Sequence, residues 1–418
     1  MNKLSFFSTL FILMLLQIFF PGGSSLGTIR ECAAQEIIVK FKPAPVQESR
    51  KLSLLKILGA KSIHGTYKDV FKIIDVPEGS MKTIIQALQK NPDIEYAEPN
   101  HTVKAFSIPN DEYYSFQWNF SIINLEKAWD YSTGEDITVA VLDSGINSHG
   151  RDGFGLRLLN GYNALISRES RWEDFNFHGT HVAGTIGQET NNGTGVAGIA
   201  FHAHLLPVKV LNRMGFGTIA SVASGIRWAT DHGADIINMS LGDSEGAQTL
   251  LEAIDYAYGK GVLLVAASGN DSSAAELNPV SYPAAYDHVL AVGAVDYTSS
   301  RSFYSNGGPE LDVVAPGGDL ENDVNSDGYA DGVLQETFVE YLGFSGFAID
   351  WNYRYLQGTS MAAPHVTGVA ALIKSLHPAW GPDEITEALI QTAKDLGPAG
   401  KDDQYGYGLI DASAAVVY

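Results

Sequence analysis

Four short segments of the chain each carry one polar residue of a type used in nucleophilic catalysis. They are VAVLDSGI with Asp143, FHGTHVAGT with His178, VAASGND with Asn270 and GTSMAAPHV with Ser360. A serine hydroxyl attacks a carbonyl effectively when an imidazole takes its proton, a carboxylate orients that imidazole, and a fixed donor stabilises the oxyanion. Together the four residues could supply these four functions.

Each of these residues also has a structural explanation when it is considered alone. Ser360 precedes apolar residues at helical spacing, so it could be a helix N-cap, with Pro364 tolerated in the first turn of that helix. A strand-end aspartate is often a cap, and a histidine among small residues is often structural, which is how we interpret His181, His204 and His365. The order Asp, His, Ser is one of the known triad orders, and four matching segments in that order favour catalysis.

The elements that must position these residues alternate between strands and helices. The sequence predicts strands at 137–143, 204–211, 235–242, 262–270 and 289–295, with helices at 218–233 and 248–261. The strands are apolar on both faces, so they should form a parallel sheet covered by helices on both sides, which is a three-layer α/β fold. Because such folds place sites at the carboxyl ends of strands, Asp143 and Asn270 should meet at one edge of the sheet.

A smaller α+β module precedes this part of the chain. Its expected order is β-α-β-β-α-β, with strands at 36–42, 61–67, 70–76 and 94–100 and helices at 47–59 and 80–90. We assign residues 35–106 to this module and residues 107–418 to the larger domain, with an insertion at 317–357.

The N-terminus has the pattern of a secretory signal. One lysine precedes an apolar run that ends at Pro21 and two glycines, which is too short for a typical membrane-spanning helix. We therefore expect a signal peptide at 1–26 and a short linker at 27–34, which predicts a secreted, extracellular protein that has no membrane contact once the signal is removed. The single cysteine, Cys32, lies just after the signal, so the exported domains have no disulfide bond.

Charge is distributed unevenly along the chain. The full sequence has a net charge of −21, but residues 35–106 carry 11 Lys and Arg against 8 Asp and Glu, a balance of +3. Residues 107–418 carry 14 basic against 39 acidic residues, a balance of −25. This argues against nucleic acid as a partner and suits a cation-binding protein, although an acidic solvated surface would explain it too.

The motifs AVLDSGI, HGTHVAGT and GTSMAAPHV, supported by INMSLG, VAASGN, ELDVVAPG and GYGLIDASAAV, resemble those of the subtilases. These are the subtilisin-type serine peptidases, and the thermitase-like and subtilisin-like branches are the most similar. The resemblance implies that Ser360 is the nucleophile, His178 the general base and acid, and Asp143 its orienting partner. It also implies that Asn270 and the Ser360 amide stabilise the oxyanion, and that residues 35–106 are an inhibitory propeptide.

The resemblance also implies a binding site for extended protein or peptide substrates. The substrate backbone would pair with two segments, Ser240-Leu241-Gly242 and Gly215-Phe216-Gly217, by strand addition. Ser281 would lie in the far wall of the primary specificity pocket, where its small size leaves room for a large side chain.

The insertion contains the sequence DVNSDGYADG, which has the ligand spacing of a calcium loop. The expected ligands are Asp323, Asn325, Asp327, the Tyr329 carbonyl and Asp331. Leu334 stands where an EF-hand has its bidentate glutamate, so this is not a complete EF-hand, and a polar turn-rich loop is the alternative.

Two more calcium sites are implied by the resemblance alone. The first would use the Asp152 carboxylate, the Asn192 side chain and further ligands from Thr190, Thr194, Val196 and Asp111. The second, weaker site would use Glu310 and Asp312.

The preferred hypothesis is a secreted, monomeric serine endopeptidase that acts through an acyl-enzyme and is made as a self-processed zymogen inhibited by its own propeptide. One alternative is a catalytically inactive calcium-binding protein on the same scaffold. Another is an esterase of the α/β-hydrolase type, but that class has a G-x-S-x-G motif and the order Ser, Asp, His, neither of which occurs around Ser360.

Overall fold

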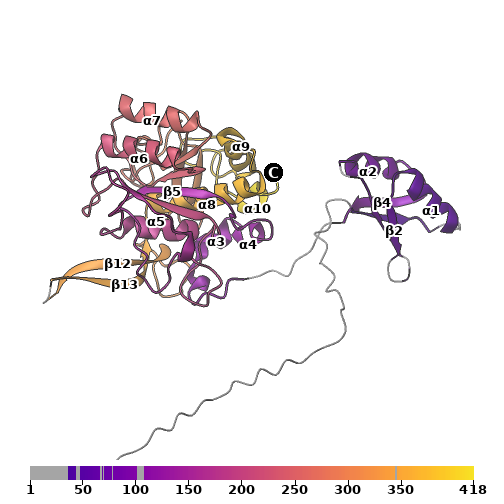
Figure 1. Ribbon diagram of the computed structural model, residues 1–418, viewed down its shortest axis with the longest axis horizontal. Helices are drawn as coiled ribbons and strands as arrows, with labels where there is room; N and C mark the ends of the chain where they lie inside the picture. The colour runs from indigo at the N-terminus through magenta and orange to yellow at the C-terminus, as the bar shows by residue number, and fades with distance from the viewer. Residues whose placement is uncertain are drawn as a thin grey trace, which may run out of the picture. The chain divides into compact units, whose positions relative to one another are not determined.

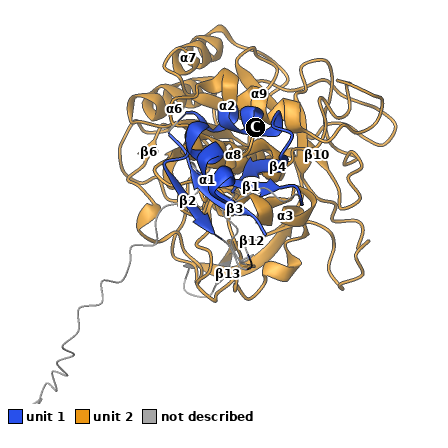
Figure 2. Ribbon diagram, turned by 90° about the vertical axis from the view of Figure 1, so that its right-hand side faces the viewer, with its two compact units in different colours: residues 1–105 blue, residues 106–418 orange. Residues whose placement is uncertain are grey.

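The computed structural model divides the chain into two compact units, residues 1–105 and 106–418 (Figure 2). It describes residues 36–43, 48–65, 68, 70–77, 79–100, 108–343 and 346–418. The expected signal peptide and linker lie outside these residues. Among the residues described, no helix combines the length and apolar character that crossing a membrane requires.

The N-terminal unit has the predicted β-α-β-β-α-β order. Its elements are β1 (Glu36–Phe41), α1 (Glu48–Ile57), β2 (Ser62–Gly65), β3 (Lys72–Asp75), α2 (Met81–Gln89) and β4 (Ile94–Pro99). The sheet has the order β2-β3-β1-β4, and its strand pairs are antiparallel. Alternate residues of β1, Ile37 and Val39, are buried with Ile74 of β3 and Leu88 of α2. The apolar faces that the sequence periods of two and 3.6 predict for strands and helices therefore meet in a common core.

The second unit contains a seven-stranded parallel sheet, which confirms the predicted fold class. The strands are β5 (Thr138–Asp143), β6 (Tyr162–Asn163), β7 (His204–Lys209), β8 (Ile236–Met239), β9 (Leu263–Ala267), β10 (Val289–Val295) and β11 (Val313–Pro316). Their order across the sheet is β11-β10-β9-β8-β5-β7-β6. The interior strand β5, between β8 and β7, is buried from Val139 to Asp143, as a sheet covered on both faces requires.

Helices cover both faces of this sheet (Figure 1). The helices α5 (His178–Gly187) and α8 (Thr359–Leu376) pack against each other on one face, and α6 (Ile219–Asp231) and α7 (Gln248–Tyr258) pack against each other on the other face. The remaining helices are α3 (Trp118–Ile122), α4 (Leu125–Ala128), α9 (Pro382–Thr392), α10 (Ala412–Ala415) and the 3-10 turns η2 (Tyr114–Phe116) and η3 (Gly155–Arg157).

Pro364 lies in the interior of α8 rather than in its first turn, so the expectation from the sequence was wrong. The helix begins at Thr359, and the missing amide of Pro364 leaves the Ser360 carbonyl without its usual partner four residues later. The Ser240 hydroxyl donates to that carbonyl over 2.9 Å. The chain therefore tolerates the proline because Ser240, the residue after β8, supplies a replacement donor.

The insertion forms a long β-hairpin that the sequence analysis did not predict. Its strands are β12 (Val333–Gly343) and β13 (Gly346–Leu356), which pair antiparallel from Val333 with Leu356 to Gly343 with Gly346. Phe338 on β12 is fully buried, while the far half of the hairpin projects from the catalytic unit (Figure 1). The alternation in VLQETFVEY was the available sequence signal for this ribbon.

Two fully buried histidines should make the protein sensitive to acid. Burial lowers the pKa of His181 to about 3 and that of His365 to about 4, whereas both groups would bind protons near the ordinary value in the unfolded chain. Because the pKa of each histidine is lower in the folded than in the unfolded protein, the free energy of unfolding decreases as the pH falls below the unfolded pKa of about 6.5.

Replacing His181 with glutamine should remove about 2 kcal/mol of the stability loss that occurs between pH 7.5 and pH 5. The measurement is chemical denaturation of His181→Gln and its parent, both carrying Ser360→Ala to prevent self-digestion. An identical pH dependence in the two proteins would show that His181 is not neutral in the folded state.

Candidate active site

Asp143 and His178 form a close pair at the carboxyl end of β5. The His178 Nδ1 atom lies 2.9 Å from each carboxylate oxygen of Asp143, whose side chain is completely buried. Burial works against the charged imidazolium, but the Asp143 carboxylate outweighs it, and the pKa of His178 is raised above its usual value. The pair fixes the tautomer with the proton on Nδ1, which leaves Nε2 free to accept a proton.

The N-terminus of α5, which carries His178, is held by a residue that the sequence analysis missed. Asp174 is fully buried and accepts hydrogen bonds from the Thr180 amide over 3.0 Å and the Thr180 hydroxyl over 2.7 Å. Its other oxygen accepts from the Asn176 amide over 2.7 Å. An acidic residue four positions before the histidine was the available signal, since carboxylates stabilise helix N-termini.

Ser360 is the second residue of α8 and does not cap the helix. The helix is preceded by Gly358, which has φ +144° and makes no side-chain cap. The Ser360 hydroxyl is partly exposed and donates to the Ser240 carbonyl over 3.2 Å. This excludes the N-cap explanation and leaves a hydroxyl at the helix start, next to the sheet edge where β8 ends.

Asn270 lies directly beside the start of α8. Its side-chain oxygen accepts hydrogen bonds from the Thr359 amide over 2.8 Å and the Thr359 hydroxyl over 3.0 Å. These bonds orient the amide group so that its NH₂ side is available to another acceptor. Asn306, which is buried and was not identified from the sequence, holds the same loop by accepting from the Asp271 and Ser272 amides.

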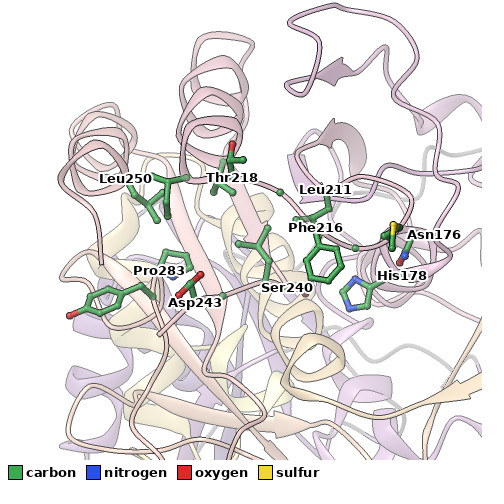
Figure 3. Close-up of a pocket in the computed structure, with 17 residues that line it drawn as sticks. Asn176, His178, Leu211, Phe216, Thr218, Ser240, Asp243, Leu250 and Pro283 are labelled. Carbon is green, nitrogen blue, oxygen red and sulfur yellow. The ribbon is translucent and has the colours of Figure 1, made fainter. Parts of the chain in front are cut away.

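A cavity of about 640 Å³ begins at His178 and extends away from it (Figure 3). Its lining includes both predicted backbone segments, Ser240-Leu241-Gly242 and Gly215-Phe216-Gly217. Phe216 lies at the same end as His178, while Leu250 and Pro283 lie at the opposite end. The cavity is therefore large enough for a side chain, and both predicted segments contribute to its lining.

A second cavity of about 330 Å³ joins the other predicted residues. It is lined by Ser360, Asn270 and Ser281, and it shares the wall at residues 241–243 with the first cavity. Asp243 and Tyr282 exchange two backbone hydrogen bonds of 2.8 Å, which tie the two walls of this cavity together. The structure thus brings Ser360, Asn270 and Ser281 to one pocket and His178 to the pocket next to it.

The predicted calcium loop of the insertion is compact and closed by its own carboxylates. Asp323 accepts from the Asp327 and Gly328 amides over 3.2 and 3.1 Å, and Asp327 accepts from the Tyr329 amide over 2.9 Å. Asn325 accepts from the Asp327 amide over 2.9 Å. The loop therefore places these oxygen atoms around one turn, as its spacing predicted.

The second predicted cation site centres on Asp152, which is only 2% exposed. Its carboxylate accepts from the Asn192 side chain over 3.0 Å and the Val196 amide over 2.9 Å. Burial, together with the nearby Glu336, raises the pKa of Asp152 to about 7. Burial disfavours the charged form of this carboxylate, and a bound cation would stabilise that charged form.

Three further members of that predicted set lie in or against the loop that contains Asn192. Asp111 accepts from the Asn191 amide over 2.9 Å and, more weakly, from the Asn192 amide over 3.4 Å. The Thr190 hydroxyl accepts from Gly198, and the Thr194 amide donates to the Asn192 side chain. The residues are brought together, although several of their oxygens already accept hydrogen bonds.

The third predicted site has a competing cation from the chain itself. Lys401 lies 3.6 Å from Asp312, and Glu310 lines the same surface cavity. Within the described part of the chain, no group of three or more His, Cys, Asp or Glu side chains has the arrangement of a metal site. Any cation site here must therefore also use amide and carbonyl oxygens.

Comparison with known proteins decides the family. Residues 134–408 match the model of the subtilase family. The chain belongs to the subtilase family. In this subtilase, residues 31–100 also match the fervidolysin N-terminal prodomain, which covers the β-α-β-β-α-β unit.

Several named relatives resemble this subtilase over most of its length. The thermophilic serine proteinase of Bacillus sp. (strain AK1) is 37% identical over 387 residues, which cover 92% of this chain and 87% of that protein. Subtilisin E of Bacillus subtilis (strain 168) is 32% identical over 419 residues and 99% of both chains.

Solved structures agree with these sequence matches. A protease from Pseudoalteromonas arctica PAMC 21717 has a TM-score of 0.64 at 38% identity and covers 74% of this chain and 99% of its own. Fervidolysin from Fervidobacterium pennivorans, described as a keratinolytic enzyme, has a TM-score of 0.63 at 27% identity over 94% of this chain and 62% of its own. This subtilase is thus a subtilisin-like serine peptidase with a prodomain.

The pair of Asp143 and His178 should be visible in the pH dependence of activity. Because the pKa of His178 is raised, kcat/KM should rise with pH through an apparent pKa above about 6.5, as the imidazole becomes neutral. In Asp143→Asn that apparent pKa should fall, and kcat should drop about 10⁴-fold because the tautomer is no longer fixed. An unchanged apparent pKa would remove Asp143 from this role.

Replacing Asn270 with leucine should remove a hydrogen-bond donor at similar volume. We expect kcat to fall by about 10²–10³ with little change in KM, the size established for the corresponding donor in subtilisin itself. Steady-state kinetics on a peptide anilide give both constants. A change confined to KM would mean that Asn270 binds the substrate rather than the oxyanion.

Proposed function

We propose that the protein is a secreted serine endopeptidase that hydrolyses peptide bonds through an acyl-enzyme intermediate. The observation that carries this proposal is the pair of buried Asp143 and partly exposed His178, at the same sheet edge as a helix-start serine whose hydroxyl does not cap its helix. The family shows a serine peptidase, and these residues supply the roles that its chemistry needs.

In the proposed mechanism the Ser360 oxygen attacks the carbonyl carbon of the scissile bond while His178 Nε2 takes the hydroxyl proton. Asp143 holds Nδ1 and stabilises the imidazolium that forms. The oxyanion is stabilised by the Asn270 side chain and by the Ser360 amide, which has no intrahelical partner in the first turn. His178 then protonates the leaving amine, and water hydrolyses the acyl-enzyme by the reverse proton path.

The substrate we propose is an extended polypeptide. The segments 240–242 and 215–217 line opposite sides of the larger cavity and would pair with both edges of the substrate backbone. The lining of that cavity includes the apolar side chains of Leu211, Phe216, Ile219, Val222, Leu241 and Leu250. A large apolar side chain upstream of the cut suits this surface, while the pocket near Ser281 accepts the residue at the cut.

We propose that residues 35–106 inhibit the peptidase as its own propeptide and are removed by the enzyme itself. The prodomain match supports this function, and the opposite charges of +3 and −25 would speed the association of the two parts. Secretion is supported by the N-terminal leader pattern and by similarity to the minor extracellular protease Epr of Bacillus subtilis (strain 168). We expect the mature enzyme to be a monomer.

We also propose that the enzyme binds structural calcium. Two observations support a cation: the buried Asp152 carboxylate, whose pKa burial raises, and the insertion loop, where Asp323, Asn325, Asp327 and Asp331 follow the spacing of a calcium loop. The ion would supply positive charge to these carboxylates and would take no part in the reaction.

Substitution of Ser360 by alanine tests both the nucleophile and self-processing. Ser360→Ala should lose casein hydrolysis completely and accumulate at unprocessed length, whereas the parent should yield a chain that starts between Phe106 and Asp111. Intact mass and N-terminal sequencing of both proteins, expressed in a host without other proteases, provide the measurement.

Two results would contradict these proposals separately. Residual activity within tenfold of the parent would show that Ser360 is not the nucleophile and that the hydrolysis takes place at another site. A Ser360→Ala chain that is already trimmed to the mature start would exclude self-processing. The assignment of Ser360 as the nucleophile would still stand.

A further inference from the structure

The loop at 323–331 contains a buried carboxylate oxygen that lacks a partner. Asp331 is 2% exposed, its Oδ2 accepts from the Val324 amide over 2.6 Å, and no described donor reaches its Oδ1. The Asp331 carboxylate and amide bond to Val324 and Asn322, the residues on either side of Asp323, so the two carboxylates belong to one turn. A buried, unpaired carboxylate oxygen among other carboxylates is costly, so this loop has the chemistry of a hard divalent cation site.

The residues that follow Asp331 connect it, through their hydrogen bonds, to α5, the helix that carries the catalytic histidine. The Asp331 amide donates to the Asn322 carbonyl over 2.8 Å, and the next carbonyl, that of Gly332, accepts from the Trp118 indole over 2.9 Å. The Val333 carbonyl, one residue further on, accepts from His181 Nε2 over 3.0 Å. The Arg354 carbonyl on β13 accepts from the same nitrogen over 3.2 Å.

Because both partners of His181 are carbonyls, its Nε2 must carry the proton, and the ring joins both strands of the hairpin to α5. His181 is fully buried and lies one helical turn after His178. The base of the hairpin is therefore attached to the first turns of α5.

A second contact reaches the residue just before His178. The Thr337 hydroxyl, which is fully buried on β12, donates to the Phe177 carbonyl over 2.7 Å. Phe177 has φ +88°, a backbone conformation that a phenylalanine seldom adopts. Thr337 thus holds the peptide group that joins this unfavourable residue to the catalytic histidine.

The hairpin also contacts the loop that follows β7. Glu340 on β12 forms an ion pair with Arg213, whose carbonyl accepts from the Asn176 side chain over 2.9 Å. Asn176 lines the larger cavity, as His178 does, and lies beside it (Figure 3). The hairpin is thereby linked to a second residue close to the imidazole.

We propose that a divalent cation bound at Asp323, Asn325, Asp327, Tyr329 and Asp331 positions His178 through the hairpin and so raises kcat. This inference rests on the proposed function. Without the ion, repulsion among the carboxylates loosens the start of β12, and the contacts of Val333 and Thr337 with α5 loosen with it. With the ion, these contacts hold the imidazole where it can accept the Ser360 proton. The residues that pair with the substrate backbone lie on other segments, so KM should change little.

The cation site itself is tested by calcium binding. Isothermal titration of calcium ions into the full-length Ser360→Ala protein, stripped of metal beforehand, should show one fewer bound ion in Asp331→Asn than in its parent. Asp327→Asn, which alters an exposed ligand and poses less risk to folding, should weaken the same ion at least tenfold. Asp296→Asn is the matched control, because Asp296 also closes a polar turn by accepting from the Thr298 and Ser300 amides. Equal numbers and affinities of bound ions in all four proteins would overturn the site.

The coupling to His178 is tested by kinetics of the mature enzyme. Stripping calcium from the parent should lower kcat by tenfold to 10²-fold, in line with the cost of a small displacement of a catalytic group, with KM changing less than threefold. Asp331→Asn should have the low kcat at every calcium concentration. Thr337→Val should bind calcium like the parent but lose most of the calcium effect on kcat, and Thr337→Ser should restore it, because serine keeps the hydroxyl.

Hydrogen exchange separates a failure of this inference from a failure of the proposed function. In full-length Ser360→Ala, calcium should slow amide exchange in α5, and Asp331→Asn should abolish that change, whether or not Ser360 is the nucleophile. If calcium binds the loop but neither exchange in α5 nor kcat responds to it, the coupling is wrong. If exchange responds and the parent proves inactive, the coupling stands and the proposed peptidase mechanism fails.

Discussion

The buried carboxylate of Asp143 is the constraint on which the rest of the structure depends. It ends β5, an interior strand of the sheet, and is completely excluded from solvent, so it must be compensated by neighbouring groups. The Ser144 amide donates to it over 2.6 Å, and His178 supplies the second donor. Gly179 makes this approach possible, because a Cβ there would lie 2.2 Å from the Gly145 carbonyl and 3.0 Å from the Asp143 Cβ. The demand of one buried charge thus fixes the position of α5 against β5.

The parts of the fold that depend on repeating patterns could be predicted from the sequence. The strands of the large sheet are apolar throughout because both faces are covered, and this alone distinguishes them from surface strands. Asp143 and Asn270 could be recognised because each is a polar residue at the end of such a run. Their meeting with Ser360 follows from the rule that parallel strands present their carboxyl ends at one edge. The assignment of catalytic roles needed the family resemblance as well, and the geometry agrees with it without testing those roles.

The features that escaped prediction depend on contacts between distant segments. Pro364 is compatible with the interior of a helix only because Ser240, which follows β8, supplies the missing donor. Asn306 supports the Asn270 loop from far along the chain, and nothing in its local sequence distinguishes it from a turn residue. Apolar and polar residues alternate along the first strand of the hairpin, but the sequence analysis predicts only an insertion at 317–357, without strands. A two-stranded ribbon is stable only where other elements cover part of it, here α5, and that cover is invisible in a local pattern.

The projecting hairpin also bears on how a protease survives among copies of itself. A cleft that grips a substrate from two sides requires a single strand with both edges free. In the ribbon, one edge of each strand is already paired with the other strand, without a break from Val333 to Gly343. The projecting part of the second unit therefore offers extended backbone in a form that the cleft of a neighbouring copy cannot enclose. Its pairing protects it from digestion, so an exposed ribbon can persist where an exposed loop of equal length would be cut.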